Sequence, residues 1–136
     1  MSSTKINFTE PPKFLLMLGC TGVDFDEQNN TSMMKFDISA DYTHSNGTVV
    51  QGGFITAMLD AAMAHLVILK RNQEVNPLSL NVNVNFIAPG APGTFIASAH
   101  IMKMGKSIAF TSAELHQNDV LIATATSANR LILLCK

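Results

Sequence analysis

A long apolar segment from Gly52 to about Arg71 places the strongest constraint on how this chain folds. Its length and its lack of period-2 alternation predict a helix and not a strand. Lys70 and Arg71 stand at its end, where the helix dipole favours cations. The rest of the chain has to cover this helix, and small residues on it allow a curved sheet to approach closely. These small residues are Ala57, Ala61, Ala62 and Ala64.

The segments after this helix are predicted to be strands joined by turns. Two strands, over residues 94–104 and 107–116, flank a turn at Gly105 and Lys106, and a last strand runs from residue 120 to about 131. The first strand, over residues 78–87, alternates almost perfectly between apolar and polar positions. The alternation places Leu80, Val82, Val84 and Phe86 on one face and Ser79, Asn81, Asn83 and Asn85 on the other.

The segments before the long helix are shorter. Residues 10–18 predict a short helix that ends at Gly19, residues 33–42 predict a strand, and residues 44–47 predict a turn. Strands in succession after one helix indicate an α+β fold, with an antiparallel sheet wrapped around one long central helix. With 136 residues and no linker, the whole chain, residues 1–136, is expected to form one domain.

Composition narrows the class of protein. The chain is 47% hydrophobic and only 14% charged, which allows a substantial core and leaves apolar surface that favours an oligomer. A net charge of −1 argues against a nucleic-acid partner. The N-terminal residues lack the apolar core of a signal peptide, and the run from Ala61 to Leu69 is too short to span a membrane. We therefore expect a cytoplasmic protein, with no membrane partner and no metal site, because no Cys or His spacing fits one.

The first half of the long helix contains the candidate catalytic groups. Gly52 and Gly53 leave backbone N–H groups uncovered where the helix dipole favours negative charge. Asp60 is the only acidic residue in the helix, and an unpaired carboxylate in such a setting is usually paired, neutralised or used. An oxyanion site and a carboxylate two turns further along predict acyl chemistry.

The chain resembles the hotdog-fold acyl-CoA thioesterases, specifically the phenylacetic-acid-degradation (PaaI-like) group, over roughly residues 42–126. Members of this group have a Gly, a short spacer, His-Gly-Gly and then a helical Asp, and here residues 47–53 and Asp60 match that signature. A second match is the strand that begins at Ser79 and ends in Ile-Ala-Pro. A third is Gly93 followed by a strand, the Gly105-Lys106 turn and a late Ala-Thr-Ala-Thr at residues 123–126.

The resemblance implies a hydrolase for acyl-CoA that needs no cofactor. Asp60 is implied to act as nucleophile or as base for water, the Gly52 N–H to hold the thioester oxygen, and Ser79 to help hold the water or the carboxylate. The group builds its site from two chains, so a homodimer is implied, commonly doubled to a homotetramer. Gly53, in the matched Gly-Gly pair, and Lys106, where the group often has a basic residue for CoA, are further substrate-binding candidates.

Two positions depart from the pattern of the group. Gln51 stands where the commonest form has His; a Gln donates a hydrogen bond to a carbonyl but is no general acid or base. The loop Asn of the group falls on Ser45, and the adjacent Asn46 fills that role only with a one-residue shift. Both Gln51 and Asn46 are substrate-binding candidates.

Two other functions stay open on the sequence. A non-catalytic acyl-CoA-binding protein on the same fold needs no carboxylate, so Asp60 counts against it. A hotdog dehydratase or hydratase needs a positioned His, which Gln51 removes, although His44 or His65 of a partner chain leaves this reading open. The acyl group is not fixed, since the pocket depends on residues such as Phe54, Met58 and Phe86.

Overall fold

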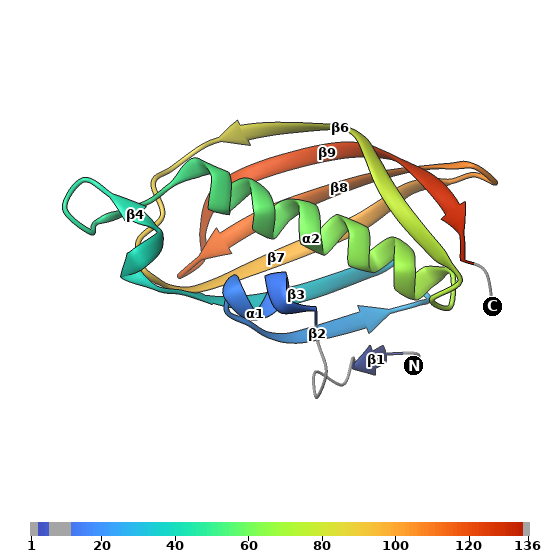
Figure 1. Ribbon diagram of the computed structural model, residues 1–136, viewed down its shortest axis with the longest axis horizontal. Helices are drawn as coiled ribbons and strands as arrows, with labels where there is room; N and C mark the ends of the chain where they lie inside the picture. Colours follow the sequence, from blue (N-terminus) through green and yellow to red (C-terminus); the bar gives the residue numbers. More distant parts are fainter. Residues whose placement is uncertain (1–2, 6–11, 135–136) are drawn as a thin grey trace.

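One long helix lies across an antiparallel sheet, as the sequence predicts. In the computed structural model, which describes residues 3–5 and 12–134, helix α2 (Gly52–Lys70) crosses one face of a seven-stranded sheet (Figure 1). The strand order is β1-β2-β3-β7-β8-β9-β6, and every neighbouring pair is antiparallel. The strands are β1 (Ser3–Lys5), β2 (Cys20–Asp26), β3 (Thr31–Ile38), β6 (Val75–Phe86), β7 (Gly93–Met104), β8 (Ile108–Gln117) and β9 (Val120–Leu133).

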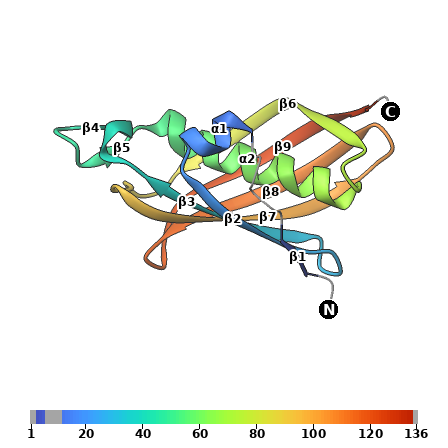
Figure 2. The same cartoon turned by 60° about the horizontal axis from the view of Figure 1, so that its bottom comes forward.

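Small side chains on the sheet meet large ones on the helix. Met58, Leu59, Met63 and Leu66 of α2 are fully buried. The central strands of the sheet beneath them present several alanines to the helix, among larger side chains such as Phe95 and Leu115. This pairing of large with small lets the curved sheet wrap closely around the helix (Figure 2). The fully buried alanines of the sheet include Ala97, Ala99 and Ala123.

The segments before α2 differ in part from the prediction. Helix α1 (Lys13–Met17) lies within residues 10–18, although residues 10 and 11 fall outside the described part of the chain. It ends as expected, because Gly19 adopts a φ of +71° and its N–H donates to the Leu16 carbonyl. Strand β2 was missed, although Val23 and Phe25 alternate with exposed residues.

Strand β3 ends earlier than predicted, and a hairpin follows it. The predicted strand ran to Tyr42, but the chain turns after Ile38 because Ser39 Oγ accepts the Asp41 N–H and starts a 3-10 turn, η1 (Ala40–Tyr42). The predicted turn at residues 44–47 then joins β4 (Thr43–His44) to β5 (Val49–Val50).

Strand β6 contains a bulge that corrects the predicted faces. Its pairing with β9 shifts register between Ser79 and Asn81, so Leu80 is the extra residue. As a result Ser79 lies on the helix-facing side together with Val82 and Val84, and not with the asparagines. Leu80, predicted to be on the apolar face, is 57% exposed. A strict period of two cannot reveal such an insertion.

Helix α2 is longer than the apolar run on which the expectation about membranes was based. The run from Ala61 to Leu69 is too short to span a membrane, but the complete 19-residue helix is long and apolar enough to do so by length and composition. Half of the tested stretch is buried inside the described structure. The core helix of a soluble protein passes the same test.

Candidate active site

The side chain of Gln51 caps the start of α2. Its Oε1 accepts the Gly53 N–H at 2.7 Å, and its backbone N–H donates to the Tyr42 carbonyl at 2.9 Å. Gly52 is the first residue of the helix, so no carbonyl of the helix accepts its N–H. Of the two glycines that the sequence singled out, Gly53 donates its N–H to the cap, whereas the Gly52 N–H has no acceptor among the described residues and lies at the positive end of the helix dipole.

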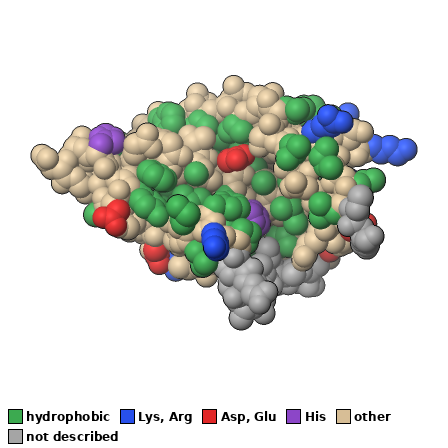
Figure 3. Space-filling view, viewed as in Figure 1, with side chains coloured by type: hydrophobic (Ala, Val, Ile, Leu, Met, Phe, Trp, Pro, Cys, Tyr) green, Lys and Arg blue, Asp and Glu red, His purple; other side chains and the backbone are tan. Residues whose placement is uncertain are grey.

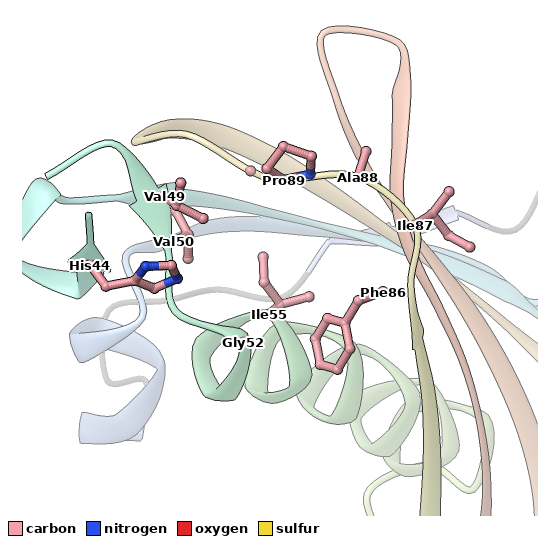
Figure 4. Close-up of a pocket in the computed structure, with 10 residues that line it drawn as sticks. His44, Val49, Val50, Gly52, Ile55, Phe86, Ile87, Ala88 and Pro89 are labelled. Atoms are coloured by element: carbon pink, nitrogen blue, oxygen red, sulfur yellow. The ribbon is translucent and has the colours of Figure 1, made fainter. Parts of the chain in front are cut away.

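A cavity of about 340 Å³ opens beside Gly52 (Figure 4). It is lined mainly by apolar residues of α2, of the β4–β5 hairpin and of the segment after β6. The Phe86 ring packs directly on Gly52: a Cβ at this position would lie 3.3 Å from Phe86 Cε1. His44 also lines this cavity, on the side of the hairpin. Gly52 therefore lies at the wall of an apolar hollow that one imidazole also lines.

A second apolar hollow, of about 400 Å³, lies between α1 and the start of α2. The Tyr42 and Phe54 rings stack there, with centroids 4.5 Å apart, and Gln51 and Gly53 complete the wall. Phe54 thus lines a hollow as expected, whereas Met58 is fully buried in the core. Over α1 and α2, hydrophobic side chains gather at the surface (Figure 3). The capped helix start therefore separates two apolar hollows.

Asp60 and Ser79 come together on the helix-facing side of β6. Ser79 Oγ donates to Asp60 Oδ1 at 3.0 Å. The bulge at Leu80 makes this contact possible, because without it Ser79 would point to the outer face of the sheet. Asp60 is half-buried and Ser79 is exposed, so water has access to the pair. The structure therefore brings together two of the three residues that the sequence assigned to catalysis.

A buried polar cluster behind this pair was missed in the sequence. Asn129 is 1% exposed, and its Oδ1 lies 3.4 Å from Ser79 Oγ. Thr111 and Ser127, both buried, accept from Asn129 Nδ2 at 3.2 and 3.0 Å. The available signal was the polar pair Ser127 and Asn129 at alternate positions of β9 that are otherwise occupied by Ala123, Ala125 and Leu131.

The remaining candidates lie elsewhere in the chain. Gly52 and Asp60 are about 12 Å apart along the helix, at 1.5 Å per residue. Asn46 lies in the tight β4–β5 turn with a φ of +60°, and does not line the Gly52 cavity. Lys106 is exposed in the β7–β8 turn, at the end of the sheet away from the start of α2 (Figure 1).

His65 is partly buried and lines neither of the two hollows at the start of α2. Its Nδ1 lies 2.8 Å from the Ala61 carbonyl, and its ring packs against Phe14. Burial lowers the pKa of His65, and the hydrogen bond to Ala61 opposes this only in part. Among the described residues, no group of three or more His, Cys, Asp or Glu side chains is placed to hold a metal ion.

Comparison with known proteins places the chain in a family. The family model for the acyl-CoA thioesterase N-terminal domain matches residues 40–129. Human acyl-coenzyme A thioesterase 13 is 26% identical over 80 residues, which cover 58% of this chain. They span only 57% of the human protein, so the match covers little more than half of that relative.

Solved structures agree on the fold. A phenylacetic acid degradation-related protein of Ralstonia eutropha JMP134 superposes with a TM-score of 0.84 and 26% identity, over 90% of this chain and 92% of the other. The E. coli PaaI protein, from the phenylacetic acid degradation operon, gives a TM-score of 0.77 at 19% identity, over 92% and 88% of the two chains.

The chain is a hotdog-fold protein and belongs to the acyl-CoA thioesterase family that the matched model describes. The predicted resemblance to the PaaI-like group is confirmed.

Proposed function

We propose that this protein hydrolyses acyl-CoA thioesters to a carboxylic acid and free CoA. The observation that carries the proposal is the Asp60–Ser79 pair, a water-accessible carboxylate with a 3.0 Å hydrogen bond, on the same helix as an unpaired Gly52 N–H. Asp60 attacks the thioester carbonyl, or activates the water that does so. The Gly52 N–H, with the helix dipole behind it, stabilises the oxyanion that develops.

Gln51 supports the same step in place of the usual histidine. Because Oε1 is held by the Gly53 N–H, the amide orientation is fixed and Nε2 is left to donate. Gln51 lines the hollow between α1 and α2, and Gly52 lines the cavity on the hairpin side, so a thioester oxygen that accepts from both would lie where the two hollows meet at the helix start. The hollows on either side of this point offer apolar surface for the acyl group and for the pantetheine arm of CoA.

We further propose that each site is built from two chains of a homodimer. A span of about 12 Å along α2 separates the oxyanion donor from the carboxylate, which is too far for one carbonyl group. Strand β6 is an edge of the described sheet and carries exposed apolar residues, as expected for a strand covered by a partner. These residues are Leu78, Leu80, Phe86 and, just after the strand, Ile87.

The wider expectations from the sequence also belong to this proposal. A partner chain would bring Lys106 to the CoA phosphates, because within one chain its turn lies away from the start of α2. The homotetramer, a single domain over residues 1–136, and a cytoplasmic location follow from the resemblance and the composition. The direct test of the activity is release of free thiol from short, medium, long and aryl acyl-CoAs.

Gly52→Pro tests the oxyanion donor with little change to the fold. Proline is favoured at the first position of a helix, where it removes only an unpaired N–H, and Gln51, with φ −66° and ψ 138°, has the backbone that a residue before proline requires. We expect kcat for thiol release to fall by about 10²- to 10³-fold. Gly52→Ala is the matched control, because it adds the same Cβ beside Phe86 but keeps the N–H. An equal loss in both variants would contradict a role for the N–H.

One observation favours a hydratase or dehydratase as second candidate. His44 lines the cavity beside Gly52 and presents the imidazole that Gln51 does not supply. If hydrolysis is the function, an enoyl-CoA should lose its thioester with no hydration of its double bond, and His44→Gln should lower thiol release by less than about tenfold. Hydration of the enoyl-CoA that disappears in His44→Gln would instead support the second candidate. Binding of acyl-CoA without either reaction would support the non-catalytic binder.

A further inference from the structure

Behind the Asp60–Ser79 pair, the buried amide of Asn129 has a fixed orientation. Its Nδ2 points at Thr111 Oγ1, Ser127 Oγ and the Ala109 carbonyl, at 3.2, 3.0 and 3.5 Å. Because a carbonyl oxygen only accepts, the amide nitrogen has to be on this side. The two hydroxyls lie 2.7 Å apart, so that one donates to the other. Asn129 Oδ1 is thereby turned towards Ser79 and has only Ser79 Oγ as a hydrogen-bond partner among the described residues.

Ser79 has one hydroxyl hydrogen and two acceptors within reach. Asp60 Oδ1 lies at 3.0 Å from Ser79 Oγ, and Asn129 Oδ1 lies at 3.4 Å. An ionised carboxylate is a stronger acceptor than an amide carbonyl, so the hydrogen points to Asp60 while Asp60 is charged. A neutral carboxyl oxygen is a weaker acceptor than an amide carbonyl. The direction of this hydrogen therefore depends on the charge of Asp60.

We propose that Asn129 is a positioning residue that takes over the Ser79 hydrogen bond whenever Asp60 becomes neutral during turnover. Asp60 loses its charge when it accepts a proton from the attacking water, or when it forms a bond to the acyl carbon while the C–S bond breaks and CoA leaves as a thiolate. The Ser79 hydroxyl then rotates to donate to Asn129 Oδ1; no bond at Ser79 or Asn129 breaks. A proton taken from water passes from Asp60 to the departing CoA thiolate, which becomes the free thiol; in the covalent route, water hydrolyses the acyl–Asp60 bond and restores the carboxylate. This inference rests on the hydrolase function proposed above.

Of the described side chains near Asp60, Ser79 and Asn129 are the ones placed to respond to a change in its charge. Strand β6 carries no titratable side chain, and α2 contributes only His65 and Lys70, more than a turn away. Lys13 of α1 is exposed. On the other strands packed against α2, the titratable side chains alternate with helix-facing residues and so lie on the outer face. They are Lys35, Asp37, His100, Lys103, Glu114, His116 and Arg130.

Asn129→Leu removes the acceptor and keeps much of the side-chain volume. Because Asn129 stabilises only the neutral form of Asp60, the acidic limb of the kcat/KM profile should move to lower pH by about 0.5 to 1 unit. Asn129→Ala should shift the acidic limb in the same direction, and it replaces Asn129→Leu in the test if the leucine variant does not fold. Thr126→Val, on the same strand but exposed on the other face, should leave the limb in place.

A double-mutant cycle separates this role from a structural one. In a Ser79→Ala background, Asn129→Leu should no longer shift the acidic limb, because the hydroxyl that links the two groups is absent. The same shift in both backgrounds, or no shift in either, would overturn the inference.

A second readout does not need turnover. Carbon NMR of carboxyl-labelled aspartate, with Asp60→Asn for assignment, gives the titration midpoint of Asp60 directly. The midpoint should fall in Asn129→Leu and stay unchanged when that substitution is made in Ser79→Ala. If the wild type releases no thiol from any acyl-CoA, the proposed function fails, while this titration still decides the role of Asn129.

Discussion

Asp60→Asn is expected to reduce thiol release from acyl-CoA by at least about 10³-fold, with little change in the affinity for substrate. An amide is neither a nucleophile nor a base at neutral pH, so both mechanisms open to Asp60 are lost together. The readout is kcat from free-thiol release, together with binding of a non-hydrolysable CoA thioether. The Gly52 N–H and the helix dipole remain, so residual activity reflects oxyanion stabilisation alone.

Asp60→Asn suits this test because it keeps the local hydrogen bond. The amide oxygen of the variant still accepts from Ser79 Oγ, as Asp60 Oδ1 does, and the half-buried position loses a charge and not a contact. We therefore expect unchanged oligomeric state and a thermal unfolding midpoint at least as high as that of the wild type. Turnover within about tenfold of wild type in a well-folded variant would remove Asp60 from the chemistry.

The fold was predictable because its main signal is one long helix without competing patterns. The apolar run from Gly52, the lack of period-2 alternation and the strands that follow are all local features, and the structure confirms them. The features that the sequence did not predict depend on how separate segments pair with one another. Strand β2 was missed beside its short helix, and the bulge at Leu80 is visible only in the register of β6 against β9.

The candidate site was predictable for the residues that stand out chemically in their own segment. Asp60 is the lone acid of an apolar helix, and Gly52 opens that helix. Asn129 could not be found this way, because its role depends on the contact with Ser79, fifty positions away in the sequence. Gln51 was recognised as a departure from the family pattern, but its capping of Gly53 needed coordinates.

A heterodimer of Asp60→Asn with Gly52→Pro is expected to recover activity that neither variant shows alone. If each site takes Gly52 from one chain and Asp60 from the other, one site of the heterodimer carries both intact groups and the second carries neither. Two-fold symmetry then predicts about half of the wild-type kcat per dimer. The gain should be at least about 50-fold over Gly52→Pro and at least about 500-fold over Asp60→Asn, since each parent lacks one essential group in both sites.

The measurement uses two co-expressed chains with different affinity tags, so that tandem purification yields the heterodimer alone. Homodimers of each variant, purified in the same way, give the baseline, and a wild-type heterodimer of the two tagged chains gives the reference. Restoration would also explain why one helix carries both groups about 12 Å apart: two copies of α2 that run antiparallel across a two-fold axis bring the start of each helix towards the middle of the other. A heterodimer as inactive as its parents would contradict a site shared between two chains, and because about 12 Å separates the two groups within one chain, it would leave Gly52 without a part in the reaction at Asp60.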